Sequence, residues 1–351
     1  MSMIVKNKGG YGWMVLLLVV TSCFKKNENI NPARPSILQF IDQTPSLSFL
    51  DSAIHRVRLD TLMSSGGPFT FFAASDSAFQ AAGLTLDSIR RMNPSTLLRI
   101  LEYQVVNGRI SAGNLPGFLK QQFTSLHPSY QPFITKSYYG IFINGVGVTS
   151  GDHELGDGIV QVTGRVVLPP TGSQLQVMEQ SPDMTFFAAL VNHVQALNLL
   201  IADPDPNSVY NGFSSNQWPS VFGNTLLVPT DSAFRAFGYP DSTSLYTDSL
   251  NLVYGFFDNN NNFHVPLLLP YLLNGFIFTA DLKGNFVIGQ GNNPVGYRGN
   301  NVNDYLVTSL DGMSLTGAGI SPDNPIKIIG PDIIASNGAI QKINQVFISH
   351  N

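Results

Sequence analysis

The feature that most constrains the fold of this 351-residue chain is an internal repeat. Residues 69–79 read FTFFAASDSAF, and residues 224–234 read NTLLVPTDSAF. In both copies an apolar run typical of a buried strand ends at a hydroxyl residue that is followed by aspartate. Serine or threonine at this place can cap the first turn of a helix, and a phenylalanine then points back toward the core. The repeat therefore predicts two modules of one design.

Two further landmarks occur in the same order in both halves of the chain. Upstream, residues 44–50 are echoed by residues 181–187, and in each a hydroxyl residue before proline predicts the start of a helix. In the first copy, apolar residues follow at spacings of three and four, which is typical of an amphipathic helix. Downstream, residues 158–161 (GIVQ) match residues 338–341 (GAIQ), and the alternation of residues 160–168 predicts a half-buried strand.

With these segments identified, each copy resembles a fasciclin-like domain. The family's first motif, Phe-Ala-Pro-Thr-Asp/Asn-x-Ala-Phe, is matched at residues 72–79 and 227–234. Its closing motif, Asn-Gly-x-Ile-His-x-Ile-Asp-x-Val-Leu, is matched at residues 157–167 and 337–347. A Tyr-His-x-x-x-Gly stretch is matched at residues 103–108 and, loosely, at 270–275. The family-motif positions are Asp76, Phe79, Tyr103, Gln104, Gly158 and Gln161 in the first copy, and Asp231, Phe234, Tyr271, Gly338 and Gln341 in the second.

The resemblance implies an α+β fold in which each copy is a β-wedge of mainly antiparallel strands with helices packed along one side. It also implies a role in adhesion or extracellular binding rather than catalysis. The chain departs from the family at the histidines, which are replaced by Gln104, Gln161, Tyr271 and Gln341, and at the closing aspartate, replaced by Gly164 and Asn344. Integrin-type recognition is therefore not carried over.

The N-terminus has the pattern of a bacterial lipoprotein. Lys6 and Lys8 precede an apolar run at residues 13–20 that is too short to span a membrane. The run ends in VTSC, which resembles a lipobox and implies lipidation of Cys23, the only cysteine of the chain. A buried free thiol is the alternative. Phe24 stands where aspartate would signal inner-membrane retention, which favours the outer membrane of a Gram-negative bacterium.

These patterns together predict the organisation of the chain. The predicted segments are a lipoprotein signal peptide at 1–22, a tether at 23–35, a first fasciclin-like domain at 36–170 and a second, with insertions, at 171–351. The short link with two prolines is compatible with a fixed arrangement of the domains. We expect a cell-envelope location and a membrane partner through the lipid. With a net charge of −4 and no basic cluster, we expect no nucleic-acid partner.

The sequence singles out no catalytic residues, no cofactor and no metal site. Asp152, His153 and Glu154 form the densest group of metal-ligand types, but we interpret them as a solvated turn before the closing strand. Residues 258–262 superficially resemble a calcium loop, yet the sixth position is Phe263 instead of glycine. A hydrolase with dispersed carboxylates remains a weak alternative, because such acids can lie far apart in sequence.

The most suggestive binding feature is an insertion at residues 203–223. It contains Tyr210, Phe213 and Trp218 among amides and serines, a composition suited to sugar stacking or to a protein contact. The alternative is that these rings pack the loop onto its own domain. Our main hypothesis is a non-enzymatic adhesion or ligand-binding lipoprotein with an unidentified extracellular protein or polysaccharide ligand. A second hypothesis is a polysaccharide-binding accessory subunit of an outer-membrane nutrient-capture system.

Overall fold

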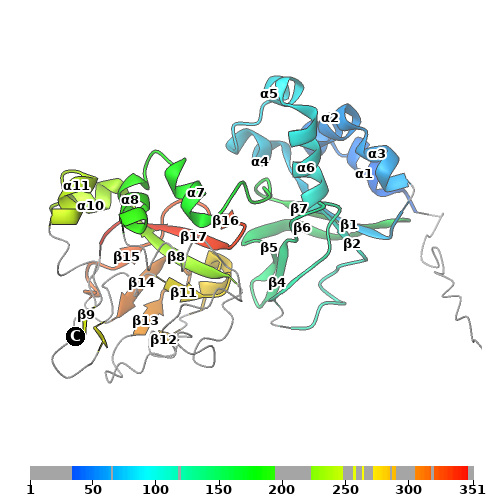
Figure 1. Ribbon diagram of the computed structural model, residues 1–351. Helices are drawn as coiled ribbons and strands as arrows, with labels where there is room; N and C mark the ends of the chain where they lie inside the picture. The colour runs from blue at the N-terminus through cyan, green and yellow to red at the C-terminus, as the bar shows by residue number, and fades with distance from the viewer. Residues whose placement is uncertain are drawn as a thin grey trace, which may run out of the picture.

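The protein folds into two lobes, each with its own hydrophobic core. The computed structural model describes residues 34–64, 66–117, 120–193, 223–247, 256–257, 263–264, 272–284, 287–289, 305–317 and 320–346. Buried apolar residues group within residues 37–167, which we call the first lobe, and within residues 175–343, the second lobe. Figure 1 shows the lobes side by side, with the helices of each on one side of its strands. The predicted α+β fold is confirmed.

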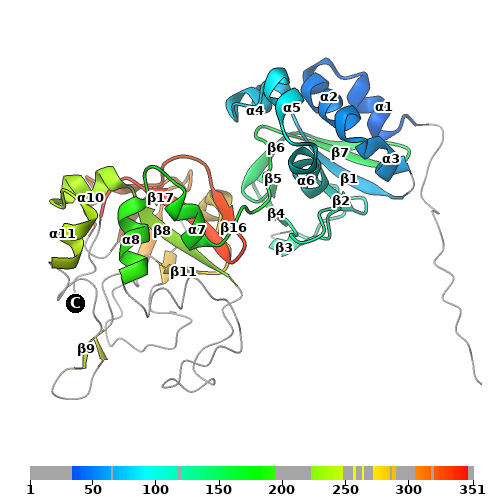
Figure 2. The same ribbon diagram turned by 45° about the horizontal axis from the view of Figure 1, so that its top comes forward.

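The first lobe is built on one seven-stranded sheet. Its helices are α1 (Ile37–Asp42), η1 (Pro45–Leu47), α2 (Ser48–Val57), α3 (Leu59–Ser64), α4 (Asp76–Ala81), α5 (Leu86–Arg91) and α6 (Pro94–Gln104). Its strands are β1 (Phe69–Ala74), β2 (Val105–Asn107), β3 (Lys120–Gln122), β4 (Phe133–Ser137), β5 (Gly140–Ile143), β6 (Val146–Glu154) and β7 (Gly158–Thr163), in the order β2-β1-β7-β6-β5-β4-β3. All neighbours are antiparallel except β1 and β7. Figure 2 shows α6 lying across this sheet.

The second lobe repeats the central part of this plan. Its described helices are α7 (Gln174–Glu179), α8 (Thr185–His193), α10 (Asp231–Phe237), α11 (Ser242–Thr247) and η3 (Thr279–Leu282). One sheet has the order β11 (Leu272–Asn274), β8 (Asn224–Pro229), β17 (Gly338–Ile343), β16 (Ile333–Ala335). Another has the order β12 (Val287–Gly289), β13 (Tyr305–Thr308), β14 (Ser314–Gly317), β15 (Ile326–Lys327), and β9 (Phe256–Phe257) pairs with β10 (Phe263–His264). The central pair, β8 and β17, is again parallel.

The closing strand β7 differs from its prediction as a half-buried strand. It lies between β1 and β6, and all its residues except Val162 are buried. The strand ends at Thr163, so Leu168 lies beyond it and is exposed. A parallel strand in the middle of a sheet is covered on both faces, which removes the solvent face that alternation implies.

The repeated segments adopt the predicted strand, cap and helix in both lobes. β1 and β8 are buried along their whole length. The Oγ of Ser75 accepts a hydrogen bond from the Ala78 amide at 3.3 Å, and Oγ1 of Thr230 accepts one from the Ala233 amide at 3.3 Å.

The phenylalanines that follow these caps occupy matching sites. Phe79 and Phe234 are both buried, and each ring packs beside an aromatic ring of the preceding helix. The centroid of Phe79 lies 6.4 Å from that of Phe49 in α2, and the centroid of Phe234 lies 5.8 Å from that of Phe186 in α8. The same large side chain therefore fills the same place in both cores.

The aspartate of the repeat caps a helix other than its own. Oδ1 of Asp76 accepts a hydrogen bond from the Phe49 amide at 2.9 Å, and Oδ2 accepts one from the Ser48 hydroxyl at 2.7 Å. Both donors lie in the first turn of α2, where amides lack partners inside the helix and a negative charge is favourable. Asp231 binds the first turn of α8 in the same way, through the Phe186 amide at 3.0 Å and the Thr185 hydroxyl at 2.6 Å.

The predicted helix start at the hydroxyl residue before proline is confirmed in the first copy and wrong in the second. Thr44 stands at the N-cap position of η1, which begins at Pro45 and runs directly into α2. Thr44 makes no cap hydrogen bond, and its Oγ1 donates to the Phe40 carbonyl of α1 at 2.6 Å. Ser181 donates its hydroxyl to Asp183 at 2.7 Å, and α8 begins only at Thr185. The start of this helix is set by a tertiary contact from the repeated aspartate, which local sequence does not reveal.

We predict that Asp76→Ala lowers the free energy of unfolding of the first lobe by about 1–3 kcal/mol, because it leaves two donors of α2 without an acceptor. The control is Asp87→Ala, which removes only exposed ion pairs to Arg90 and Arg91 and should cost at most about 0.5 kcal/mol. Urea unfolding followed by circular dichroism measures both. Equal losses in the two variants would contradict the capping role.

Candidate functional site

The glycines of the closing motif are required by the close approach of two parallel strands. A Cβ added to Gly158 would overlap the carbonyl oxygen of Phe69 in β1. One added to Gly338 would overlap the carbonyl oxygen of Asn224 in β8. Both pairs are direct partners in the register of the parallel strands. These two motif positions therefore serve the fold of each lobe and are not presented to a ligand.

The motif glutamine of the first lobe belongs to a buried hydrogen-bond network. Gln161 is fully buried, and its Nε2 donates to the Ile110 carbonyl and to Oδ1 of Asp152, both at 2.8 Å. The Asp152 amide donates back to Oε1 of Gln161 at 2.9 Å. The carboxylate of Asp152 also accepts from the Ala112 amide at 3.0 Å. The network thus ties β6 and β7 to the segment that follows β2.

The second lobe repeats this network except for the bond to the glutamine Oε1, because Oε1 of Gln341 has no partner among the described residues. Nε2 of Gln341 donates to the Ile277 carbonyl at 3.1 Å and to Oδ1 of Asp332. The carboxylate of Asp332 accepts from the amide and the hydroxyl of Thr279, each at 2.8 Å. In both lobes the aspartate lies nine residues before the glutamine. This shared spacing is the sequence signal for the pair, and our reading of the motifs missed it.

The interpretation of Asp152, His153 and Glu154 as a solvated turn was wrong about the turn, although Asp152 and Glu154 are exposed as expected. They lie in β6, where the register against β7 is irregular and Asp152 has a positive φ of 57°. The ring of His153 lies 4.8 Å from that of Phe40, and Glu154 forms an ion pair with Arg34 at 2.7 Å. The three side chains therefore bind three different partners.

The middle motif of the first lobe lies in the core. Tyr103 is fully buried, and its hydroxyl accepts a hydrogen bond from Nδ2 of Asn144 at 2.9 Å. Burial raises the pKa of the Tyr103 hydroxyl, so this group stays protonated. Gln104 is also buried, with Nε2 donating to the Ile100 carbonyl at 3.1 Å and with no partner for Oε1 among the described residues. Tyr103 thus ties α6 to the turn between β5 and β6, whereas the hydrogen bond of Gln104 stays within α6.

A buried histidine packs on this tyrosine. His127 meets the Tyr103 ring edge-on at 5.7 Å and stacks on Tyr130 at 5.3 Å. Its Nδ1 accepts hydrogen bonds from the amides of Ser129 at 3.2 Å and Tyr130 at 3.0 Å, which requires the neutral ring. Burial, and secondly the positive charge of Arg99, lower the pKa of His127.

The described family-motif positions, from Asp76 to Gln341, are therefore buried or partly buried and contact groups of their own lobe, whereas Gly164 and Asn344, which replace the closing aspartate, are exposed. Several predicted site residues lie outside the described residues, namely Cys23, Tyr210, Phe213, Trp218 and Tyr271. The calcium-like segment at 258–262 lies outside them as well. Within the part of the chain that the structure describes, no three metal-ligating side chains lie close enough together to hold an ion. In the same residues, no helix is both long and apolar enough to cross a bilayer.

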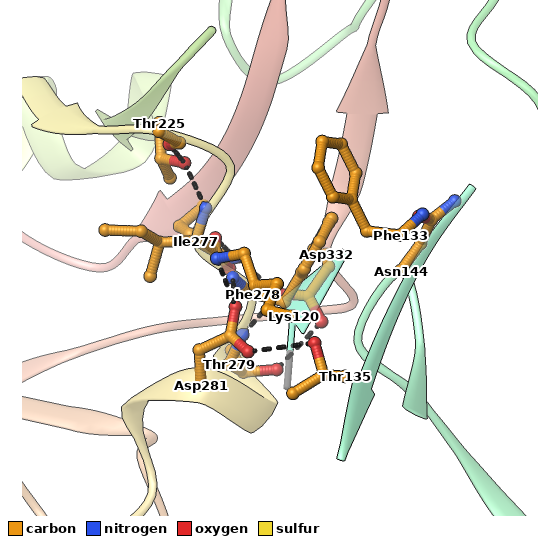
Figure 3. Close-up of polar contacts among 12 residues, drawn as sticks. Lys120, Phe133, Thr135, Asn144, Thr225, Ile277, Phe278, Thr279, Asp281 and Asp332 are labelled. Carbon is orange, nitrogen blue, oxygen red and sulfur yellow. Dashed lines mark hydrogen bonds and ion pairs between the residues drawn. The ribbon is translucent and has the colours of Figure 1, made fainter. Parts of the chain in front are cut away.

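The two lobes meet through an aromatic contact that the motifs do not contain (Figure 3). The ring centroid of Phe133 in β4 lies 4.6 Å from that of Phe276. It lies 6.2 Å from that of Phe278, which Figure 3 shows beside Phe133. Lys120 of β3 lies 5.8 Å above the Phe278 ring. Phe278 is fully buried. Residues from the first lobe's sheet thus pack on the segment between β11 and η3.

Polar contacts surround these rings. Lys120 forms an ion pair with Asp281 at 2.9 Å, and the Thr135 hydroxyl donates to the same carboxylate at 3.2 Å. A second ion pair joins Arg165 to Asp332 at 3.7 Å. The Asp332 side chain is only 1% exposed, so the donors around it compensate for the lost solvation of its charge. Two ion pairs therefore flank the aromatic contact, each with its cation on the first lobe and its carboxylate on the second.

Comparisons with known proteins place the chain in a family. Residues 45–169 match the family model described as the fasciclin domain. The chain is 30% identical over 137 residues to Protein sll1483 of Synechocystis sp., a match that covers 38% of this chain and 74% of that protein. A solved FAS1 domain pair from the insect cell adhesion molecule fasciclin I is similar with 15% identity and a TM-score of 0.32, covering 85% of this chain and 95% of that chain. The chain belongs to the fasciclin family, which is associated with cell adhesion or binding.

We predict that acidification destabilises the first lobe through His127. Because the folded pKa lies below the ordinary value of 6.5, the unfolded chain binds this proton more readily, and the free energy of unfolding decreases as the pH falls below 6.5. His127→Phe keeps a ring but cannot titrate, so it should be less stable at neutral pH and show a smaller decrease on acidification. Urea unfolding at about pH 7.5 and about pH 5.5 measures this. An unchanged pH dependence in the variant would refute the assignment.

Proposed function

We propose that this protein is a lipid-anchored lipoprotein of the cell envelope whose two fasciclin domains bind an extracellular protein or polysaccharide without catalysing a reaction. The observation that carries the binding role is the burial of the described motif positions, which makes the shared motif a scaffold. In such a scaffold, recognition falls to exposed residues that differ between relatives. The ligand is therefore specific to this chain's surface and not to the family motif.

We further propose that the second lobe is a diverged fasciclin domain. Three sets of contacts support this proposal. The cap from Asp231 to α8, the close approach at Gly338 and the network of Gln341 with Asp332 repeat those of the first lobe. A single ancestral module that was duplicated accounts for all three.

The anchor is proposed from the N-terminal pattern. A basic start, a short apolar run and the sequence VTSC are typical of a lipoprotein precursor. Each acyl methylene that enters the bilayer contributes about 0.8 kcal/mol, and stable anchoring needs more than one chain. A cysteine that carries several acyl chains meets that requirement, and the outer membrane is the location we favour.

The non-enzymatic assignment is part of the same proposal. Among the residues that the structure describes, two carboxyl groups have displaced pKa values, those of Asp183 and Asp311. Burial raises the pKa of Asp183, but hydrogen bonds from Lys342 and Ser181 outweigh it and the net pKa is lowered. A hydrogen bond from Ser309 lowers the pKa of Asp311. A general acid for hydrolysis requires the opposite displacement, so these two groups do not support the hydrolase alternative.

We predict that Cys23→Ala abolishes lipidation and releases the protein from membranes. Expression in a Gram-negative host with labelled palmitate should label the unaltered chain and leave the variant unlabelled in the soluble fraction. Because the chain has one cysteine, a thioether-linked label has one possible site. Ser22→Ala keeps a small residue before the cysteine and serves as the control, with labelling retained. Membrane-bound Cys23→Ala protein would refute the anchor.

We predict that the chain lacking residues 1–22 binds envelope or matrix components when it is immobilised and screened against glycan and protein arrays. Trp218→Ala distinguishes the two binding hypotheses. Loss of glycan binding with an unchanged circular dichroism spectrum would favour the polysaccharide-capture role, because aromatic rings such as the Trp218 indole stack on sugars. Protein binding that persists in the variant would favour adhesion. Failure to bind across both arrays would contradict the proposed function.

A further inference from the structure

The loop at residues 109–115 of the first lobe is a compact turn after β2. The Ile110 amide donates to Oγ1 of Thr70 at 2.8 Å. The Ser111 amide donates to Oδ1 of Asn114 at 2.8 Å, which closes the turn. Asn114 is exposed, and Leu115 at the end of the loop is buried.

The loop at residues 276–282 of the second lobe repeats this turn bond for bond. The Ile277 amide donates to Oγ1 of Thr225 at 2.7 Å. The Phe278 amide donates to Oδ2 of Asp281 at 2.9 Å, and the following Leu282 is buried. The two loops are therefore equivalent positions of the repeated module, and their differences can be compared residue by residue.

The side chains that contact the other lobe differ between the two loops. Phe276, Phe278 and Asp281 of the second lobe correspond to Arg109, Ser111 and Asn114 of the first. Serine and asparagine build the same turn, so neither the aromatic rings nor the negative charge is needed for the loop itself. Arg109 instead donates to three carbonyl oxygens within its own lobe. The two phenylalanines and the aspartate thus supply the contact between lobes, and the Phe276 ring also lies against Gly223 of its own lobe.

The equivalent aspartates of the buried networks differ in the same way. Asp152 is exposed in the first lobe, whereas the Asp332 side chain is 1% exposed. Asp332 is covered by the turn between β5 and β6, where Gly145 has a φ of 76°. A Cβ on Gly145 would overlap Oδ2 of Asp332 and would lie 2.8 Å from Cβ of Phe278. The turn therefore fits the surface of the second lobe only with glycine at this position.

We propose that residues 276–281 form a docking site dedicated to the first lobe of the same chain, and that this contact holds the two lobes as one rigid body in solution. Phe276, Phe278 and Asp281 determine the pairing, with Gly145 as the matching element on the first lobe. The inference goes beyond the proposed binding function and does not depend on the anchor or on a ligand.

The asymmetry of the two loops also limits assembly. A contact between the end of one module and the loop of the next is heterologous, and such contacts propagate into chains when every module carries the same loop. The first lobe has arginine, serine and asparagine at the docking positions. Its loop therefore offers no aromatic site for the second lobe of another molecule. The contact joins the two lobes of one chain and does not link molecules into longer assemblies.

Distances between spin labels on the two lobes test the proposal. Ala81 in α4 and Ala236 in α10 are equivalent exposed positions, and both are changed to cysteine in the whole chain carrying Cys23→Ser. We expect one narrow distance distribution. The double variant Phe278→Ser with Asp281→Asn, which installs the turn residues of the first lobe, should broaden it.

Gly145→Ala should broaden the distribution from the other side of the contact. Its control is Gly83→Ala, because Gly83 has a similar φ of 71° but nothing within 4 Å of an added Cβ, so the distribution should stay narrow. Circular dichroism checks that every variant is folded. The two variants that should broaden the distribution lie in different lobes, Gly145→Ala in the first and the Phe278 and Asp281 double variant in the second. A broad distribution in the parent chain, or one that neither variant changes, would overturn the proposal. Equal broadening by Gly145→Ala and Gly83→Ala would also overturn it.

Discussion

The parallel pairing of the first and last core strands is the constraint on which each lobe depends. In the first lobe β7 pairs with β1, and in the second β17 pairs with β8, so residues far apart in sequence close one sheet. The approach is close enough that Gly158 and Gly338 cannot carry a side chain. At the other end of β1 and β8, Asp76 and Asp231 fasten the preceding helix. Sheet closure and helix attachment are thus encoded at the two ends of the same strand.

One buried network has acquired two uses in this chain. In the first lobe the carboxylate of Asp152 meets solvent, while in the second that of Asp332 is covered and faces Arg165 of the first lobe. The bonds from the glutamine Nε2 and to the aspartate carboxylate recur in both lobes, whereas Oε1 of Gln341 has no partner among the described residues and Oε1 of Gln161 accepts from Asp152. The surface around the network also changed, through the aromatic residues of the neighbouring loop. A duplicated module can therefore gain a partner without altering its core, because the turn and the contact use different atoms.

Much of the fold could be predicted from the sequence, and the site could not. Strand, cap and buried phenylalanine follow from local patterns around residues 69–79, since each is set by neighbours in the chain. The capping of α2 by Asp76 is a contact across 27 residues, and no local rule reveals it. Phe276 and Phe278 lie in no motif, and their role depends on Phe133 of the other lobe. Contacts between lobes depend on how the folded surfaces fit together, and the hydrophobic periodicity of the sequence does not reveal that fit.

The replacement of the family histidines by glutamine has a physical consequence for the networks. Gln161 supplies two donors and one acceptor beside Asp152 without a titrating group. A histidine beside the same carboxylate would change its charge near neutral pH, because an ordinary imidazole titrates there. Nε2 of Gln341 likewise donates to Asp332, whose carboxylate also faces Arg165 across the lobe contact. Glutamine does not titrate, so the net charge around Asp332 and Arg165 does not change with pH through the motif residue.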